Sequence, residues 1–175
     1  MDEINHNEAV LAGQLAQHGI NIIRTAETAA AIPAISPSDL IAQLAQHPSP
    51  RLRDSLIALF LRHPEYAEYM PELVERLPDA AALHHLYTAA VYLQRLWRGV
   101  LGLYLGDFPL LPNYFGETQM SLPTPDLAFG EAGLRLLAQK QKQITGYDWL
   151  SVYESAISLL LLQLRLENKN GLTPG

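Results

Sequence analysis

The stretch that decides the fold is residues 79–105, which read DAAALHHLYTAAVYLQRLWRGVLGLYL. Leucine and alanine recur through it at spacings of three and four residues, which is the period of an α-helix. Its polar and small positions share one narrow stripe: His84, Thr88, Tyr92, Arg95, Gly99 and Gly102. A helix that is apolar around the rest of its circumference is buried on several sides. We therefore expect one long helix over 79–105 at the centre of an all-α fold.

Helix start signals recur before this stretch. Ser36-Pro37 and Ser49-Pro50 each place a capping side chain ahead of a proline that suits the first helical turn. Each of the segments that they open ends at a histidine that precedes proline. A histidine at a helix C-terminus interacts favourably with the last carbonyl groups. We expect these structural roles, and no catalytic one, for His47 and His63.

Stop signals complete the division into helices. Gly19 follows a helical run over 7–18, and Gly146 follows another over 130–145. Asp148 or Ser151 is expected to cap the last helix, which ends near Glu167. These signals predict a compact bundle of about six to eight helices in one domain over residues 1–167, followed by a flexible tail over 168–175. Residues 20–32 stay ambiguous, because their isoleucines favour a strand and their alanines favour a helix.

The last helix is also unusually apolar. Four consecutive leucines, Leu159 to Leu162, cover most of its directions, and serines form a narrow stripe beside them. A domain of this size buries one such helix comfortably. Two of them suggest either a shared place at the centre of the bundle or a surface that faces a partner.

Residues 39–77 resemble a HEAT-like helical repeat. The resemblance lies in Leu40-Ile41-x-x-Leu44, in the turn from His47 to Asp54, and in an apolar face at 56–60. A second Leu-Val-x-x-Leu, over residues 73–77, follows the first after 33 residues, close to a repeat period. The resemblance implies a stacked helical hairpin of the kind that often docks proteins. An ordinary helical pair within a bundle explains the same pattern equally well.

Residues 106–125, GDFPLLPNYFGETQMSLPTP, form a loop rich in proline and aromatic residues. Loops of such length are uncommon in compact domains and are usually functional or disordered. Its aromatic side chains predict that it is ordered against a surface. A pocket between this loop and the helix over 79–105 is one candidate site. Its candidate ligand-binding or partner-binding residues are Tyr92, Arg95, Arg98, Asp107 and Tyr114.

The arginines of this candidate site have three possible partners. Buried arginines need acceptors, and Asp107, Glu117, Glu131 or Glu154 would supply them through ion pairs within the protein. A partner protein or a small anionic ligand would do so through the bidentate guanidinium fork. We favour the internal ion pairs. Gly99 and Gly102, on the same helix, are expected to allow close helix crossing rather than the approach of a ligand.

Composition excludes several classes of function. The chain has no cysteine, which removes thiolate metal sites and cysteine nucleophiles. Its net charge of −6 is spread thinly, without the basic stripe that nucleic-acid binders usually show, which disfavours DNA or RNA as the main ligand. His84 and His85 are adjacent and point about 100° apart on a helix, which disfavours a shared metal ion. We expect no metal, no cofactor and no membrane segment, and a cytoplasmic protein.

No catalytic motif emerges from the sequence. Phosphate-binding glycine loops and the nucleophile elbow are both absent. We therefore expect a non-catalytic interaction or regulatory accessory subunit, antitoxin-like or a scaffold partner, that binds another protein subunit or forms a homo-oligomer. The alternative is an enzyme or a binder of a small anionic ligand, with the pocket between 79–105 and 106–125.

Overall fold

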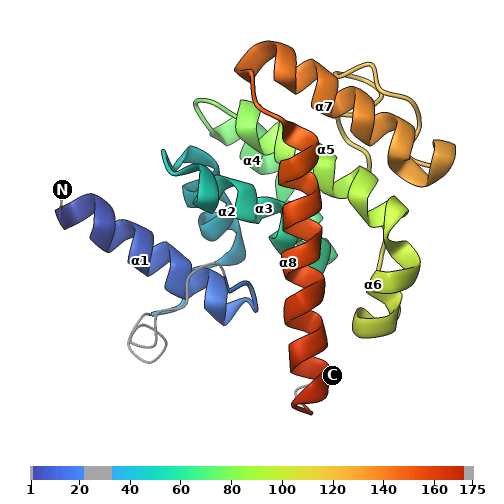
Figure 1. Ribbon diagram of the computed structural model, residues 1–175. Coiled ribbons are helices and arrows are strands. Elements are labelled where there is room, and N and C mark those ends of the chain that lie inside the picture. The colour runs from blue at the N-terminus through green and yellow to red at the C-terminus, as the bar shows by residue number, and fades with distance from the viewer. Residues whose placement is uncertain (1, 22–32, 172–175) are drawn as a thin grey trace.

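The computed structural model describes residues 2–21 and 33–171 (Figure 1). Within these ranges it contains eight α-helices, two short 3-10 helices and no strand, which confirms the all-α prediction. The elements are α1 (Asp2–Gln17), α2 (Pro37–Gln46), α3 (Pro50–Arg62), η1 (Pro64–Tyr69), α4 (Met70–Arg76), α5 (Ala81–Leu96), α6 (Arg98–Leu105), η2 (Leu127–Gly130), α7 (Glu131–Thr145) and α8 (Trp149–Lys169).

Helices α3 and α5 form the centre of the fold. They pack against each other, and α2, α7 and α8 cover them from several sides. In Figure 1, α8 runs down the middle of the view, with α1 on one side and α6 on the other. The eleven buried residues of α5 face neighbours in every direction, as its apolar circumference predicts. None of the described helices is both long and apolar enough to cross a membrane.

Local signals account for several helix ends, although Ser49, expected to cap α3, makes no side-chain cap hydrogen bond. The backbone N–H of Asp39 donates to Ser36 Oγ at 3.1 Å, so Ser36 caps α2. At the start of α8, Asp148 accepts from the backbone N–H of Ser151 and is therefore the cap, as one of the two alternatives predicted. Gly19 and Gly146 both have a φ of +79°, the left-handed conformation that ends a helix.

The prediction of one helix over 79–105 is wrong. Trp97 has φ −106° and ψ 15°, which breaks the segment into α5 and α6. Backbone hydrogen bonds from Trp97 to Leu93 and from Leu101 to Trp97 continue on both sides of the break. No proline marks this position, and the two helices pack differently. Nearly all of α5 is buried, whereas only Leu101 of α6 is.

Two helices are longer than the sequence suggested. The first begins at Asp2 rather than at residue 7, and α8 continues to Lys169, so two residues of the expected tail are helical. Residues 172–175 of that predicted tail lie outside the described residues. The same holds for 22–32, where the choice between helix and strand stays open.

Candidate functional site

The residues predicted to bind a ligand at the loop over 106–125 mostly hold the loop itself. Tyr92 donates its hydroxyl hydrogen to the carbonyl oxygen of Pro123 at 2.6 Å. Arg95 donates from Nη2 to the carbonyl oxygen of Leu111 and from Nη1 to Gln94 Oε1, both at 2.9 Å. Hydrogen bonds from these two side chains thus satisfy backbone carbonyl groups of the loop, which contains turns but no helix or strand between residues 106 and 125.

Two neighbours on α5 complete this anchoring. Gln94 accepts from the backbone N–H of Leu111 at 2.7 Å and donates to the carbonyl oxygen of Pro109. Tyr87 donates to the carbonyl oxygen of Pro112 at 2.7 Å. The loop is therefore ordered against α5, and it is bound through its main chain.

Three glycines surround Tyr92. A Cβ atom built on Gly133 would lie 2.0 Å from Cε1 of the Tyr92 ring. One on Gly116 would lie 2.7 Å from its hydroxyl oxygen, and one on Gly130 would lie 2.5 Å from its carbonyl oxygen. Because any larger residue would collide there, these glycines let α7 and the loop pack directly on α5. Gly99 and Gly102, by contrast, have no neighbour within 4 Å of such an atom, so the predicted close crossing does not occur there.

The other predicted site residues do not converge. Arg98 and Asp107 are exposed, while Tyr114 stacks on Tyr87 with ring centroids 5.8 Å apart. Among the described residues, neither Arg95 nor Arg98 forms an ion pair, so the expected internal salt bridges are not made. Arg95 Nε is buried without a hydrogen-bond partner in that part of the chain, but neither of the two cavities described below borders it.

Helix α8 carries two apolar faces. Its buried residues Tyr153, Ile157, Leu160 and Leu164 recur at helical spacing and contact the core. On the opposite side, Leu159, Leu162 and Leu166 are 63%, 50% and 46% exposed. Before these leucines, on the same side of the helix, lie exposed serines at positions 151, 155 and 158. We call these six residues the outer face of α8. An exposed helix face that carries no charge is typical of an interaction surface.

A cavity of about 440 Å³ lies between α3 and α8. Aliphatic side chains line most of it: Ile20, Ala58, Val152, Ala156, Leu159 and Leu160. Asp54 of α3 also lines this cavity, and it borders a second one, of about 450 Å³, on the side of His85 and Trp149. Cavities of this size and character are typical of small-molecule sites.

Asp54 belongs to a polar cluster at the junction of α3, α5 and α8. Burial raises the pKa of the Asp54 carboxyl to about 6, although the nearby Arg53 guanidinium lowers it. The Tyr153 hydroxyl oxygen lies 2.5 Å from Nε2 of His85, and burial lowers the pKa of that imidazole to about 4. The pKa of Tyr153 is raised by burial and further by the charge of Asp54. Shifted ionisable groups beside a cavity are a recognised mark of functional sites.

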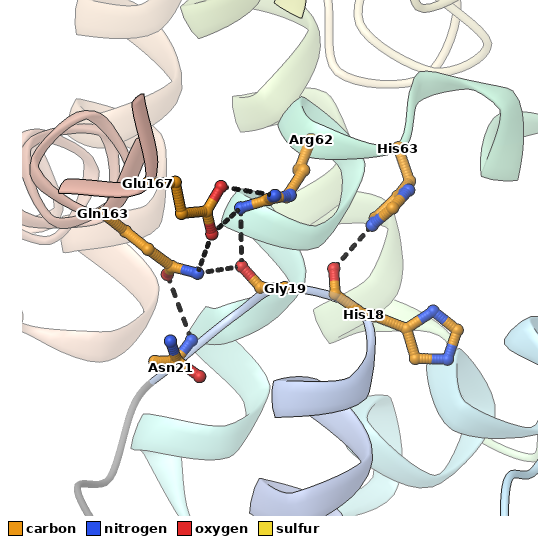
Figure 2. A network of polar contacts seen from close by, with 7 residues as sticks. All are labelled: His18, Gly19, Asn21, Arg62, His63, Gln163 and Glu167. Carbon is orange, nitrogen blue, oxygen red and sulfur yellow. Dashed lines mark hydrogen bonds and ion pairs between the residues drawn. The ribbon is translucent and has the colours of Figure 1, made fainter. Parts of the chain in front are cut away.

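A network of hydrogen bonds fixes one end of the cavity between α3 and α8 (Figure 2). Arg62 donates to the carbonyl oxygen of Gly19 at 2.9 Å and pairs with Glu167 of α8 at 2.8 Å. Gln163 of α8 donates to the same Gly19 carbonyl and accepts from the backbone N–H of Asn21. The network ties the end of α1 to α3 and α8, and it sets the position of Ile20 and Asn21 in the cavity wall.

Residue patterns did not reveal this cluster. Asp54 appears in the sequence as a single acid in an amphipathic helix, and Tyr153 and His85 are 68 positions apart. Only the packing of α3, α5 and α8 brings them together. Within the described part of the chain, no group of three or more histidine or acidic side chains is placed to hold a metal ion.

Comparison with known protein families, with curated proteins and with solved structures finds no match for this chain. The HEAT-like resemblance of residues 39–77 therefore stays a prediction.

Proposed function

We propose that this chain is a non-catalytic interaction protein, an accessory or regulatory subunit that assembles through the outer face of α8. The observation that carries the proposal is the exposure of Leu159, Leu162 and Leu166 opposite the buried stripe of the same helix. Covering such leucines releases roughly 25 cal/mol for each Å² removed from water. The 21 residues of α8 offer a surface about 30 Å long for this purpose.

A second copy of the chain is the occupant that this face fits best. Serines occupy its first half and leucines its second half. If two α8 helices pair in antiparallel orientation about a two-fold axis near Ser158, each serine half meets a leucine half. Large side chains then lie opposite small ones, which gives close packing, and both copies use the same surface, as a two-fold interface requires.

The charges that flank the outer face support the same arrangement. Glu154 and Arg165 are exposed and lie on one side of it, 11 residues apart. In an antiparallel pair, residues on the same flank face each other, so that Glu154 of one copy approaches Arg165 of the other. Opposite charges at such positions favour the pairing and its register.

The alternative function, a small anionic ligand between α5 and the loop over 106–125, has less support. Tyr92 and Arg95 already bind loop carbonyl groups, and Arg98 and Asp107 are exposed. A ligand there would have to replace hydrogen bonds that hold the loop. We therefore favour assembly through α8.

Light scattering on the purified chain tests this proposal. We expect a mass of twice 19.4 kDa for the unchanged chain and of 19.4 kDa for Leu162→Glu. Leu103→Glu is the matched control, because Leu103 is 82% exposed but lies on α6, and this variant should stay dimeric. A monomeric unchanged chain, or equal effects of the two substitutions, would contradict the proposal. If the chain instead forms a complex with a different protein, and Leu162→Glu abolishes that complex, then the outer face of α8 is still the interaction surface. Its partner would then be that protein rather than a second copy.

A further inference from the structure

The cavity between α3 and α8 combines an apolar wall with a single carboxylate. Its aliphatic lining comes from the segment after α1, from α3 and from α8. Asp54 is the one acid among its described lining residues. Ser55, Ser151 and Ser155 add neutral polar groups. A site of this composition suits a compact ligand with an apolar body and one polar end.

The Asp54 carboxylate lacks the partner that its partial burial calls for. Within the described residues no side chain or backbone group donates a hydrogen bond to it, and it forms no ion pair. The nearby Arg53 guanidinium is engaged elsewhere, because its Nη1 donates to the carbonyl oxygens of His47 and Pro48. Arg51 also lines the cavity, but its side chain is exposed. A half-buried carboxylate that accepts no hydrogen bond and forms no ion pair is costly, which leaves Asp54 ready to accept a charged donor.

We propose that this cavity binds a small organic amine, with its apolar body against the α3 and α8 side chains and its ammonium group on the Asp54 carboxylate. An ammonium donates up to three hydrogen bonds, and pairing it with a carboxylate is stronger than pairing a neutral hydroxyl. A ligand with a carboxylate would instead face the like charge of Asp54. The site therefore distinguishes ligands by their head group, while the apolar body supplies most of the binding free energy.

The shape of the cavity is set by the segment after α1 and by α8. Gly19, Gln163 and Arg62 hold Ile20 and Asn21 in place at one end. Val152 and Ala156, on α8, are half-buried beside the cavity rather than on the outer face. The amine site adjoins the proposed dimer surface, because Ser151, Ser155 and Leu159 of the outer face also line the cavity. It does not rest on the proposed function.

Calorimetric titration with hexylamine, hexanol and hexanoate at neutral pH tests the proposal. The three probes share one apolar chain, so differences among them report on the head group. We expect hexylamine to bind roughly 10-fold more tightly than hexanol, in line with a charge-assisted hydrogen bond, and hexanoate to bind most weakly. Asp54→Asn should abolish the preference for the amine. Glu75→Gln, which removes an exposed acid on α4, should leave that preference unchanged.

A second variant separates the cavity from the carboxylate. Ala156→Leu adds volume to the cavity wall and should weaken all three probes together while Asp54 remains. Equal binding of hexylamine and hexanol to the unchanged chain would overturn the proposal, whether or not the variants fold. So would an amine preference that survives Asp54→Asn, or hexylamine binding that Ala156→Leu leaves intact.

Discussion

Gly133 of α7 lies directly against the ring of Tyr92 on α5: a Cβ atom at Gly133 would come within 2.0 Å of Cε1 of that ring. Tyr92 is completely buried, and its hydroxyl donates to the carbonyl oxygen of Pro123 at the far end of the loop over 106–125. One tyrosine therefore joins α5, α7 and the loop. The glycine is what allows the helices to approach this closely.

Gly133→Ala should accordingly destabilise the protein. The added methyl group would displace a buried ring, and overpacking of this kind typically costs about 1–3 kcal/mol. Gly102→Ala is the matched control, because Gly102 lies in α6 with nothing within 4 Å of its would-be Cβ. There alanine should stabilise the helix by about 0.5–1 kcal/mol. Urea denaturation of both variants measures these changes, and effects of the same sign would contradict the packing described for Tyr92.

Tyr92→Phe should loosen the loop without unfolding the core. The change removes the hydrogen bond to Pro123 and leaves that carbonyl oxygen without its donor, at a cost of about 1 kcal/mol. Hydrogen exchange should become faster at the backbone amides of Met120 and Leu122, which are hydrogen-bonded within the loop. Tyr147→Phe, at an exposed tyrosine, should change neither rate. Unaltered exchange in Tyr92→Phe would show that the loop is held by other contacts.

Asp54→Asn should change how stability depends on pH. The folded-state pKa of Asp54, about 6, lies above its value in the unfolded chain, near 4, because burial disfavours the charged form. Its contribution to stability is therefore present below about pH 4 and is lost as the pH rises to about 6. Relative to the unchanged chain, Asp54→Asn should gain stability across this window by about 1 kcal/mol, allowing for solvent screening.

The variant must be compared with the unchanged chain because His85 changes the free energy of unfolding with pH in the opposite direction to Asp54. The pKa of His85 is lowered by burial to about 4, so its contribution is lost as the pH falls from about 6.5 towards 4. The difference in unfolding free energy between Asp54→Asn and the unchanged chain cancels the His85 effect. Urea titrations at several pH values give this difference. A difference that stays constant between pH 4 and 6 would mean that Asp54 is not buried as described.

Local sequence signals were sufficient for most of the fold. A cap such as Ser36 or a stop such as Gly146 acts within one helical turn, so its effect is visible in a few residues of sequence. The break at Trp97 was missed because neither proline nor glycine occupies that position. A periodic pattern alone therefore overestimated the length of the central helix.

The candidate site was less accessible to sequence analysis. The polar residues on α5 were expected to form internal ion pairs or to bind a partner or a ligand, but Tyr92 and Arg95 bind backbone carbonyl groups of the loop. Such acceptors are present in every residue and leave no mark in the sequence. Asp54 gave no signal because its significance lies in burial beside a cavity. The excess of leucine on the last helix left open whether the helix is central or faces a partner, and the structure leaves Leu159, Leu162 and Leu166 exposed.

Disulfide trapping across α8 tests the central claim most directly, because the chain has no cysteine of its own. A single cysteine at Ser158, near the proposed two-fold axis, should form a disulfide-linked dimer on mild oxidation. The control is Gln139→Cys, at an exposed position on α7. Rapid dimer formation by Ser158→Cys and slow formation by Gln139→Cys is the result that assembly through α8 predicts. Equal rates for the two variants would contradict it.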